Sequence, residues 1–206
     1  MLTQVEVDPD DPAFENPSKP IGPFFDEEAA KKIGAELSWL MKEDSGRGRR
    51  HVVPSPKLKH VCDISLVQIM ARRGTVVIAV GGGAIPVVRD PNGVRKGVTA
   101  VIDKDLTSAL MANVLGIDTL MILTAVPKVA IHFGTEKEEC LDRVTLQEIR
   151  AYHMEGYFPA GSMGPKIDAA IQFLGGGGNR VIIGQIDQAM QALNGETGTR
   201  IVSNDK

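Results

Sequence analysis

The sequence predicts an α/β protein, on the evidence of two patterns. Short aliphatic runs alternate with amphipathic stretches from about residue 60 onwards, which is typical of strands joined by helices in a mostly parallel sheet. The strongest of these runs are almost continuous in β-branched or aliphatic residues, as strands covered on both faces are. With 206 residues, of which 43% are hydrophobic, the chain is long enough to bury a substantial core.

Four segments are predicted as strands, and two more are weaker candidates. The four have the sequences TVVIAV, VTAVI, TLMILT and VII, at residues 75–80, 98–102, 119–124 and 181–183. The weaker candidates cover residues 129–133 and 200–202.

The helices predicted between them have recognisable ends. Asp63 is placed to cap a helix that continues to residue 72 and stops at Gly74. Thr145 followed by Glu148 forms a capping box at the start of a helix that runs towards residue 155. Apolar residues recur at helical spacing over 106–115 and over 166–174, and the glycine run 175–178 ends the second segment.

Residues 8–60 differ in composition from the rest of the chain. Seven of the twelve prolines lie here, mostly in NPSKPIGPFF (16–25) and VVPSPK (52–57), on either side of one plausible helix at 26–41. This density of proline, with charged residues among it, predicts an excursion or subdomain attached to the sheet. Trp39 is expected to pack against the helix.

Composition excludes several classes of protein. The 23 Lys and Arg residues are balanced by 26 Asp and Glu, so a strongly basic nucleic-acid-binding surface is not expected. No run approaches the ~18 apolar residues of a membrane span, and acidic residues occupy the start of the chain, where a signal peptide would be basic and then apolar. Cys62 and Cys140 have neither metal-ligand spacing nor the number needed for a disulfide framework. We expect a cytoplasmic protein with no membrane or nucleic-acid partner and no metal held by its own side chains.

Three glycines follow the strongest predicted strand directly. Gly81, Gly82 and Gly83 would then lie at the carboxyl end of a strand, where open α/β sheets bind ligands. Glycine at this place lets backbone N–H groups approach an anion closely. The run does not fit a Walker A loop, because no Gly-Lys-Ser/Thr follows it, nor the dinucleotide-binding fingerprint, because Pro86 stands where the third glycine would be. A flexible turn remains the alternative.

Two lysines are predicted at the starts of helices, where a positive charge is unfavourable. Lys104 lies between Asp103 and Asp105, and Lys166 follows the segment GSMGP (161–165). A cation at a helix N-terminus opposes the helix dipole at a cost of about 0.3–1 kcal/mol, so an anionic ligand explains both lysines better than helix stability does. A transferring phosphoryl group requires such neutralisation, and the two lysines are predicted to share one polyanion.

The acidic residues beside Lys104 have more than one interpretation. Each of Asp103 and Asp105 alone is best explained as a helix cap. Together they could hold the ammonium group of Lys104 in place or contribute to a magnesium site.

The remaining polar candidates are weaker. The four histidines, at residues 51, 60, 132 and 153, show no ligand spacing and are interpreted as surface or internally satisfied side chains. Residues 47–51 (RGRRH) form a basic cluster that could meet phosphate, although a solvated loop is the simpler interpretation.

Seven blocks of the sequence resemble the carbamate kinases, a branch of the amino-acid kinase superfamily. They are NPSKPIGPFF (16–25), MKEDSGRGRRHVVPSP (41–56), VIAVGGGAIPVV (77–88), AVIDKDLTSALMA (100–112), ILTAV (122–126), EGYFPAGSMGPKIDAAIQFL (155–174) and GTRI (198–201). The blocks are long, collinear and spread over essentially the whole chain, so the resemblance is specific to carbamate kinases.

The resemblance implies a three-layer αβα sandwich with the amino-acid kinase fold. The reaction it implies is the reversible conversion of ATP and carbamate to ADP and carbamoyl phosphate, with Mg²⁺. In cells this reaction usually runs towards ATP and closes fermentative arginine breakdown. Family members are dimers, so the resemblance also implies a homodimer.

The resemblance also implies a role for each matched residue. Lys104 and Lys166 would stabilise the transferring phosphoryl group, and Asp105 would orient both lysines. The glycines 81–83 would line the carbamate side, and Lys19 lies in a segment that resembles the subdomain folded over carbamoyl phosphate. The nucleotide would lie along Thr124, Ala125, Val126, Ser162, Met163 and Gly164.

The chain departs from the family at its amino-terminal end. Family members begin with a strand and a Gly-Gly-Asn-Ala loop that contacts the phosphoryl group, and this sequence has no such segment. We therefore expect an incomplete amino-terminal lobe: residues 1–60 would be the remnant of the acceptor lobe with its Pro-rich protruding subdomain, and residues 61–206 the nucleotide-binding core. Loss of a loop that stabilises transition-state charge typically lowers the rate about 10²–10³-fold.

This departure keeps a second function open. The alternative to a carbamate kinase is a non-catalytic nucleotide-binding chain, or a partner subunit completed by another chain. A sister kinase that acts on acetylglutamate or a nucleoside monophosphate is disfavoured by the blocks NPSKPIGPFF and VVPSP.

Overall fold

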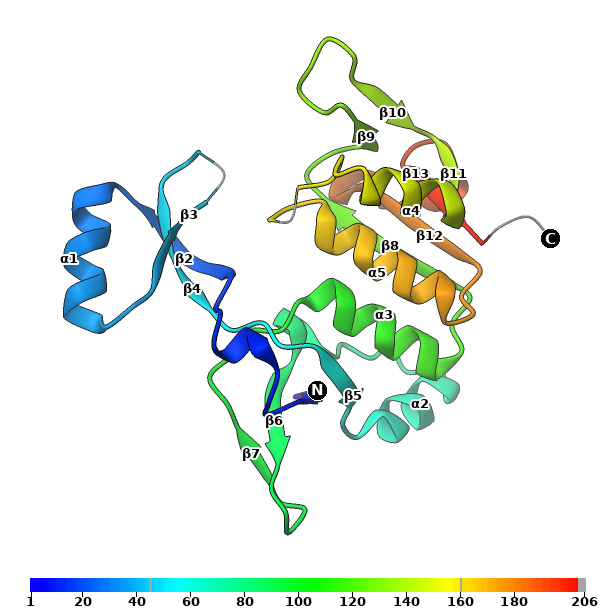
Figure 1. The fold of residues 1–206 in the computed structure, drawn as a ribbon. Coiled ribbons are helices and arrows are strands. Elements are labelled where there is room, and N and C mark those ends of the chain that lie inside the picture. The colour runs from blue at the N-terminus through cyan, green and yellow to red at the C-terminus, as the bar shows by residue number, and fades with distance from the viewer. Residues whose placement is uncertain (45, 160, 204–206) are drawn as a thin grey trace. The chain divides into compact units, whose positions relative to one another are not determined.

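The computed structural model describes residues 1–44, 46–159 and 161–203, and the chain forms two compact units (Figure 1). The first unit comprises residues 1–107 and the second residues 108–206. The change of unit falls well after residue 60, so residues 61–107 belong structurally with the first unit. The functional division expected at residue 60 stays a prediction.

The first unit is built on a mixed four-stranded sheet. Its central strand β1 runs parallel to β6 and antiparallel to β5, and β7 pairs antiparallel with β6. Val5, Val7 and Val87 are almost fully buried, and full burial of such a side chain contributes about 1.5–3 kcal/mol. In the order β5-β1-β6-β7, the strands are Leu58–Val61, Gln4–Val7, Ile85–Arg89 and Arg95–Gly97.

Two of the four predicted strands are wrong. Residues 75–80 and 98–102 form no strand, although both are rich in β-branched residues. Val76 and Ile78 are 92% and 81% exposed. Strand propensity describes how well a residue fits a paired, half-buried surface, and these segments make isolated hydrogen bonds in place of a ladder, such as Val101 N to Pro54 O at 2.9 Å.

The Pro-rich region folds as a small α/β subdomain of the first unit, which Figure 1 shows projecting from the β1 sheet. An antiparallel sheet of order β2-β4-β3 is accompanied by helix α1. Asp26 caps α1 by accepting a hydrogen bond from Ala29 N at 2.8 Å. The elements are η1 (Pro12–Phe14), β2 (Lys19–Phe25), α1 (Glu27–Leu37), β3 (Met41–Glu43) and β4 (Arg49–Val53).

Trp39 lies beyond this helix, because α1 is shorter than the predicted 26–41. Ser38 ends the helix in the left-handed conformation, with φ 55°. The Trp39 indole then stacks on the His51 ring, with centroids 4.3 Å apart. Trp39 therefore links the end of α1 to strand β4, and it also lines a small cavity with Ala30 and Gly34 of the helix, in agreement with the expected packing.

The helix predicted after Asp63 is present as α2 (Ile64–Arg72), but the predicted cap is wrong. Asp63 has φ 58° and makes no capping hydrogen bond. Its carboxylate instead pairs with Arg95, whose Nη1 lies 3.0 Å from Oδ2. A long-range ion pair thus replaces the local contact that sequence spacing suggested.

The second unit has a mixed sheet of order β11-β13-β12-β8. β12 runs parallel to β8 and antiparallel to β13, which in turn runs parallel to β11. The α/β class is confirmed. Two of the three strand pairs in this sheet are parallel, as predicted, whereas the β5-β1-β6-β7 sheet of the first unit has one parallel pair and two antiparallel pairs. The strands are β8 (Thr119–Thr124), β9 (Val129–Ile131), β10 (Glu139–Leu141), β11 (Arg143–Thr145), β12 (Arg180–Gln185) and β13 (Thr199–Val202).

The helices of the second unit confirm most of the sequence predictions. The capping box is present, since Thr145 Oγ1 accepts from Glu148 N at 3.2 Å while the Glu148 carboxylate accepts from Thr145 N at 2.7 Å. Phe173 and Ile167 are fully buried on α5, which packs against β8 and β12. The helices are α4 (Leu146–Met154), α5 (Gly164–Gly175), η3 (Ile186–Gln188) and α6 (Ala189–Asn194).

Helix α3 (Lys104–Leu115) begins in the first unit, and its later residues are counted with the second. In the described part of the chain, none of the helices has the length and apolar character that a membrane crossing requires.

Candidate functional site

The glycine run forms a tight turn, η2 (Gly81–Gly83), in the first unit. No strand precedes the turn, so the expected position at a strand's carboxyl end is corrected; β6 follows it instead. Gly83 has φ 98°, and a Cβ there would lie 2.0 Å from the carbonyl oxygen of Ile102. Val80 and Ala84 flank the turn with φ values of 49° and 72°, which non-glycine residues rarely adopt. Such strain, about 1–3 kcal/mol per residue, is often found at ligand-binding sites.

A buried threonine ties this turn to the start of α3. The Thr107 hydroxyl lies 3.1 Å from Gly83 O and 3.0 Å from Asp103 O, and the residue is fully buried. The glycine turn and the first turn of α3 are therefore neighbours within the first unit.

Asp103 is the centre of a charged contact at the start of α3. Its Oδ1 accepts a hydrogen bond from Asp105 N at 2.9 Å, which caps the helix, and its Oδ2 lies 2.5 Å from Lys19 Nζ. Burial alone would raise the pKa of Asp103. The hydrogen bond and charge of Lys19, together with the backbone N–H groups of Asp105 and Leu106, outweigh burial and hold that pKa below its ordinary value.

Lys104 and Asp105 form an ion pair beside this contact. Lys104 Nζ lies 3.2 Å from Asp105 Oδ1; the lysine side chain is 60% exposed and that of Asp105 only 8%. A buried carboxylate thus holds an accessible ammonium group at a helix start. This ion pair is the arrangement expected of an acid that holds Lys104, and that role stays a prediction.

The expected nucleotide-side residues all lie in the second unit. Thr124 ends β8 and pairs with Gln185, the last residue of the parallel strand β12, so both strands end at one edge of the sheet. Ala125 and Val126 form the bend that follows β8. Loops at the carboxyl ends of parallel strands are where open α/β sheets bind ligands.

The start of α5 lies at the same edge, as its connection to β12 requires. The helix ends four residues before β12 begins and packs against β12 and β8. Its 12 residues span about 18 Å, close to the roughly 20 Å covered by the six residues of β12. The amino end of α5, with Ser162, Met163 and Gly164 around it, is therefore at the edge where Thr124 ends β8.

Lys166 lies in the first turn of α5. Pro165 occupies the start of the helix, as predicted. A Cβ on Gly164 would lie 2.9 Å from Pro159 O, so the loop before the helix requires glycine. The N–H groups of Gly164 and Lys166 already donate to Pro159 O and Met163 O. An anion at this helix start would thus rely on the Lys166 ammonium group more than on backbone donors.

Comparison with known proteins identifies the family. The profile described as Amino acid kinase family matches residues 28–185, which is most of the chain. The chain belongs to the amino acid kinase family.

This amino acid kinase is similar to curated carbamate kinases and carbamate kinase-like proteins. The carbamate kinase of Pyrococcus furiosus is 50% identical over 202 residues, covering 98% of this chain and 64% of the relative. The carbamate kinase-like protein YahI of Escherichia coli is 47% identical with the same two coverages. This chain therefore spans about 64% of the length of these curated relatives.

Solved structures agree with this relationship. Carbamate kinase from Giardia lamblia bound to citric acid superposes with a TM-score of 0.92 at 43% identity, covering 99% of this chain and 64% of that one. The same enzyme bound to AMP-PNP gives a TM-score of 0.85 at 43% identity, covering 99% and 65%.

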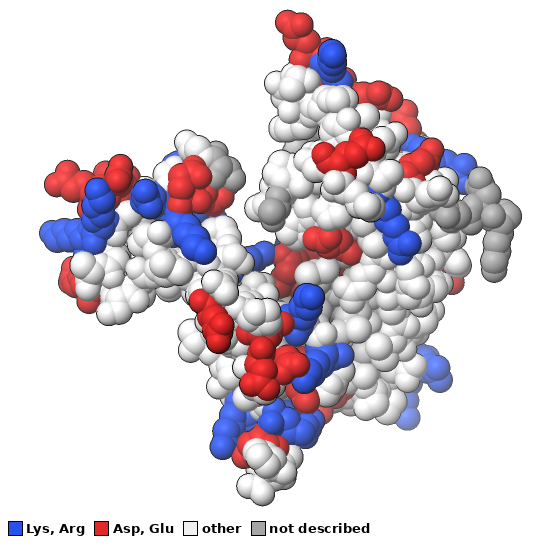
Figure 2. Space-filling model, viewed as in Figure 1, with Lys and Arg blue, Asp and Glu red and all other residues white. Residues whose placement is uncertain are grey.

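The basic cluster of this amino acid kinase has structural partners. Arg50 and Arg47 pair with the buried Asp44, at 3.1 Å and 3.6 Å, and both guanidinium groups lie over the Phe24 ring. Arg49 lies 3.9 Å from Glu27. On the face drawn in Figure 2, blue and red side chains lie close together over this subdomain. The cluster is thus a stabilising element of the subdomain, and the solvated loop expected there is corrected.

The histidines are placed as sequence analysis expected, with one exception. His153 pairs with Asp168 at 2.8 Å, and His132 contacts Tyr157 edge to face. His60 is the exception, because it lies beside Cys62 and Glu6.

Sequence reasoning missed two features of the site. Asp103 is expected to cap a helix, or with Asp105 to hold Lys104 or a magnesium ion, and nothing in the local sequence indicates that Lys19, 84 residues away, reaches its carboxylate. The group formed by Glu6, His60 and Cys62 was also missed. Its local signal is the spacing His-x-Cys, and its third member comes from another strand.

Proposed function

We propose that this chain carries out reversible phosphoryl transfer between ATP and carbamate, giving ADP and carbamoyl phosphate. The observation that carries the proposal is the Lys104–Asp105 ion pair at the start of α3, tied through Thr107 to the glycine turn. The similarity to carbamate kinases over 98% of the chain supports the choice of carbamate as acceptor.

The chemistry follows from the charge distribution. Phosphoryl transfer needs the negative charge on the equatorial oxygens to be neutralised and the reactants to be aligned. Lys104 supplies an exposed ammonium group whose position is fixed by the buried Asp105 carboxylate. Because the Lys104–Asp105 ion pair exists before substrate binds, the protein needs little rearrangement when negative charge develops on the phosphoryl oxygens in the transition state.

The acceptor side of the proposed site lies at the glycine turn and at Lys19. In this turn Gly83 lies against the carbonyl oxygen of Ile102, whereas a Cβ on Gly81 or Gly82 would meet open space. Lys19, held by Asp103, brings the β2 subdomain to the start of α3. We propose that Lys19 contacts carbamoyl phosphate and that the glycines line the carbamate pocket.

The nucleotide side lies in the second unit. We propose that residues 124–126 and 162–164 border the nucleotide at the sheet edge where β8 ends, and that Lys166 approaches its phosphates. That Lys104 and Lys166 share one polyanion stays a prediction from the sequence.

Mg²⁺ is implied by the proposed reaction, and the two aspartates at the start of α3 do not fit a site for it. Asp103 and Asp105, the acids nearest the proposed centre, already face Lys19 and Lys104. Mg²⁺ commonly binds through substrate phosphates with few protein ligands, so we propose that it enters with the nucleotide.

We also propose that in cells the reaction runs towards ATP at the end of arginine breakdown, and that the chain forms a homodimer.

A second candidate is nucleotide binding without turnover. The residues proposed to border the nucleotide belong to the second unit, which has its own sheet and core. In this candidate the second unit would hold the nucleotide, and the phosphoryl transfer that Lys104 is proposed to assist would not occur.

The test is ATP formation from ADP and carbamoyl phosphate by the purified chain. Wild type is expected to turn over, and Lys104→Ala and Lys166→Ala to lose at least about 10²-fold in rate, the typical cost of removing a group that stabilises transition-state charge. Lys96→Ala and Lys137→Ala are controls in the first and second units, since neither lysine lies in the proposed site. Calorimetric binding of ADP with no ATP formed would favour the second candidate and contradict the first.

A further inference from the structure

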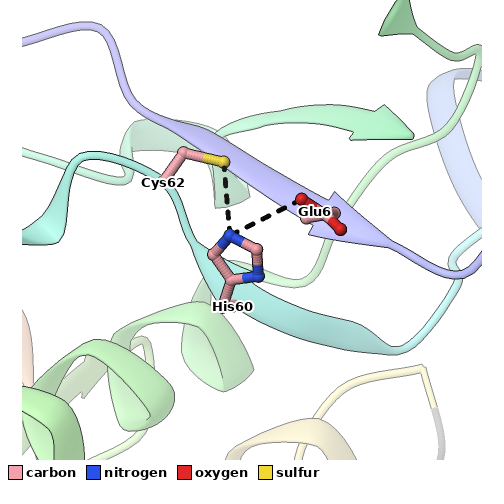
Figure 3. A group of neighbouring side chains, drawn as sticks. All are labelled: Glu6, His60 and Cys62. Atoms are coloured by element: carbon pink, nitrogen blue, oxygen red, sulfur yellow. Dashed lines mark hydrogen bonds and ion pairs between the residues drawn. The ribbon is translucent and has the colours of Figure 1, made fainter. Parts of the chain in front are cut away.

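A group of three potential metal ligands lies on the sheet of the first unit, outside the proposed phosphoryl-transfer site (Figure 3). The antiparallel pairing of β1 and β5 sets Glu6 directly opposite His60. Cys62 follows His60 by two residues, and its backbone N donates to Gln4 O at 2.8 Å, which keeps it alongside β1. The register of one strand pair therefore brings a carboxylate, an imidazole and a thiol together.

The distances between these side chains approach those around a tetrahedral ion. His60 Nε2 lies 3.5 Å from Glu6 Oε2 and 4.0 Å from Cys62 Sγ, and one ligand atom from each residue lies within 4.8 Å of the others. In a tetrahedral zinc site with ordinary bond lengths, the N···O and N···S edges are about 3.4 Å and about 3.6 Å. Side-chain adjustments of a few tenths of an ångström would bring these two contacts to such values. The third contact, between Glu6 and Cys62, lies within 4.8 Å and would have to close towards about 3.6 Å.

Burial and access also suit a bound ion. Cys62 is 1% exposed, and the side chain of Glu6 is 15% exposed, whereas the His60 side chain is 51% exposed. An ion could enter past the imidazole and keep a water molecule as its fourth ligand. In the described parts of the chain, no other group of three His, Cys, Asp or Glu residues meets the same distance condition.

The charges around the group decide how it could hold a cation. Arg89 donates to Glu6 Oε2 from Nε at 3.1 Å, and its Nη2 lies 3.0 Å from the same oxygen. Because this is also the oxygen that lies 3.5 Å from His60 Nε2, binding an ion would require the carboxylate to rotate so that Oε1 faces the imidazole while Arg89 keeps its contact with Oε2. A thiolate and a carboxylate together balance the charge of a divalent ion. Arg95, the other guanidinium nearby, is already paired with Asp63.

We propose that Glu6, His60 and Cys62 form a binding site for Zn²⁺. The choice of zinc follows from the ligand set, because sulfur and imidazole nitrogen with one carboxylate oxygen suit Zn²⁺ and are poor ligands for Mg²⁺ or Ca²⁺. Zn²⁺ bound here would join β1 to β5 and so stabilise the sheet of the first unit. The proposal is independent of the phosphoryl-transfer reaction.

Cobalt(II) is the probe for the experiment, because it occupies zinc sites and its spectrum reports on the ligands. The full chain, stripped with a chelator, is titrated with Co²⁺. We expect saturation at a single equivalent, visible bands of tetrahedral intensity, a thiolate-to-cobalt charge-transfer band in the near ultraviolet, and loss of all these bands when Zn²⁺ is added.

Matched variants assign the ligands. Cys62→Ser should abolish the charge-transfer band, and His60→Ala and Glu6→Gln should each weaken binding by more than about tenfold. Cys140→Ser, which changes the exposed cysteine, should leave titration and spectrum unchanged. Circular dichroism checks the fold of each variant. If Cys62→Ser does not fold, the affinity of His60→Ala for Co²⁺ is the deciding measurement, because His60 is exposed and its replacement should not disturb the core. Absence of saturable binding, or unchanged affinity in His60→Ala, would overturn the proposal.

Discussion

Lys19 and Asp103, 84 residues apart in the sequence, are joined by a contact of 2.5 Å between Nζ and Oδ2. The lysine belongs to β2 of the projecting subdomain, and the aspartate caps the helix that begins with Lys104. Because the carboxylate is buried and the lysine only partly exposed, water screens this pair less than it screens a surface salt bridge. The contact makes the subdomain and the start of α3 one polar network.

The first prediction concerns the stability that this pair contributes. Lys19→Met keeps most of the apolar stem and removes the charge, which leaves the buried Asp103 carboxylate without its nearest cation. The free energy of unfolding should fall by about 1–3 kcal/mol, the usual cost of removing a hydrogen bond to a charged group. Urea unfolding at neutral pH measures it. Lys42→Met, at an exposed lysine that donates to Pro17 O, is the control and should change stability by less than about 0.5 kcal/mol.

The second prediction is a pH dependence with a definite sign. The pKa of Asp103 is lower in the folded chain than its ordinary value, so the unfolded state binds more protons at this site. The stabilisation is therefore complete above the unfolded pKa of about 3.9 and is lost as the pH falls through the folded value. Asp103→Asn should be less stable than wild type at pH 6, and the difference in urea midpoint should shrink as the pH is lowered below 4. A difference that grows in acid would contradict the assignment.

The strands of the second unit were predicted better than those of the first, because the predicted segments of the second unit have neighbouring strands to pair with. The segment 119–124 became β8, because β12 lies beside it over its whole length. The equally aliphatic segment 75–80 found no such neighbour among the described residues and stayed irregular. Local composition can indicate the capacity to form a strand, but the presence of a partner is a property of the whole fold.

The same limit applies to the candidate site. The positions of Lys104 and Lys166 at helix starts could be predicted, because caps, glycines and proline are local signals. The pairing of Asp103 with Lys19, and of Glu6 with His60, could not, because each depends on strands or loops distant in the sequence. The structure therefore adds the Lys19–Asp103 contact beside the predicted Lys104, and this contact depends on the fold and not on local sequence.

The third prediction concerns the exposed aliphatic segment 75–80. Val76 and Ile78 are almost fully exposed, and contiguous exposed apolar groups favour association. The double variant Val76→Lys, Ile78→Lys should leave the unfolding free energy within about 1 kcal/mol of wild type, since each surface substitution typically costs no more than about 0.5 kcal/mol. Sedimentation velocity should show less self-association than in wild type. A large loss of stability would instead mean that these side chains are packed in solution.

The last prediction separates two glycines of one turn by what surrounds them. A Cβ at position 83 would lie 2.0 Å from Ile102 O, which is backbone and cannot rotate away, and the residue has φ 98°. At position 81 a Cβ would meet nothing within 4 Å, and the backbone is not left-handed. Gly83→Ala should therefore displace the turn from the start of α3 and cost at least about 3 kcal/mol, in the range of severe strain and overpacking. Gly81→Ala should change stability by less than about 1 kcal/mol. Thermal unfolding of the two variants gives the comparison, and equal melting temperatures would show that the turn and Ile102 are not packed as described.

The same two variants should differ in activity. Because Thr107 joins Gly83 to Asp103, Gly83→Ala should also lower phosphoryl transfer in any fraction that folds, whereas Gly81→Ala should not disturb the ion pair of Lys104.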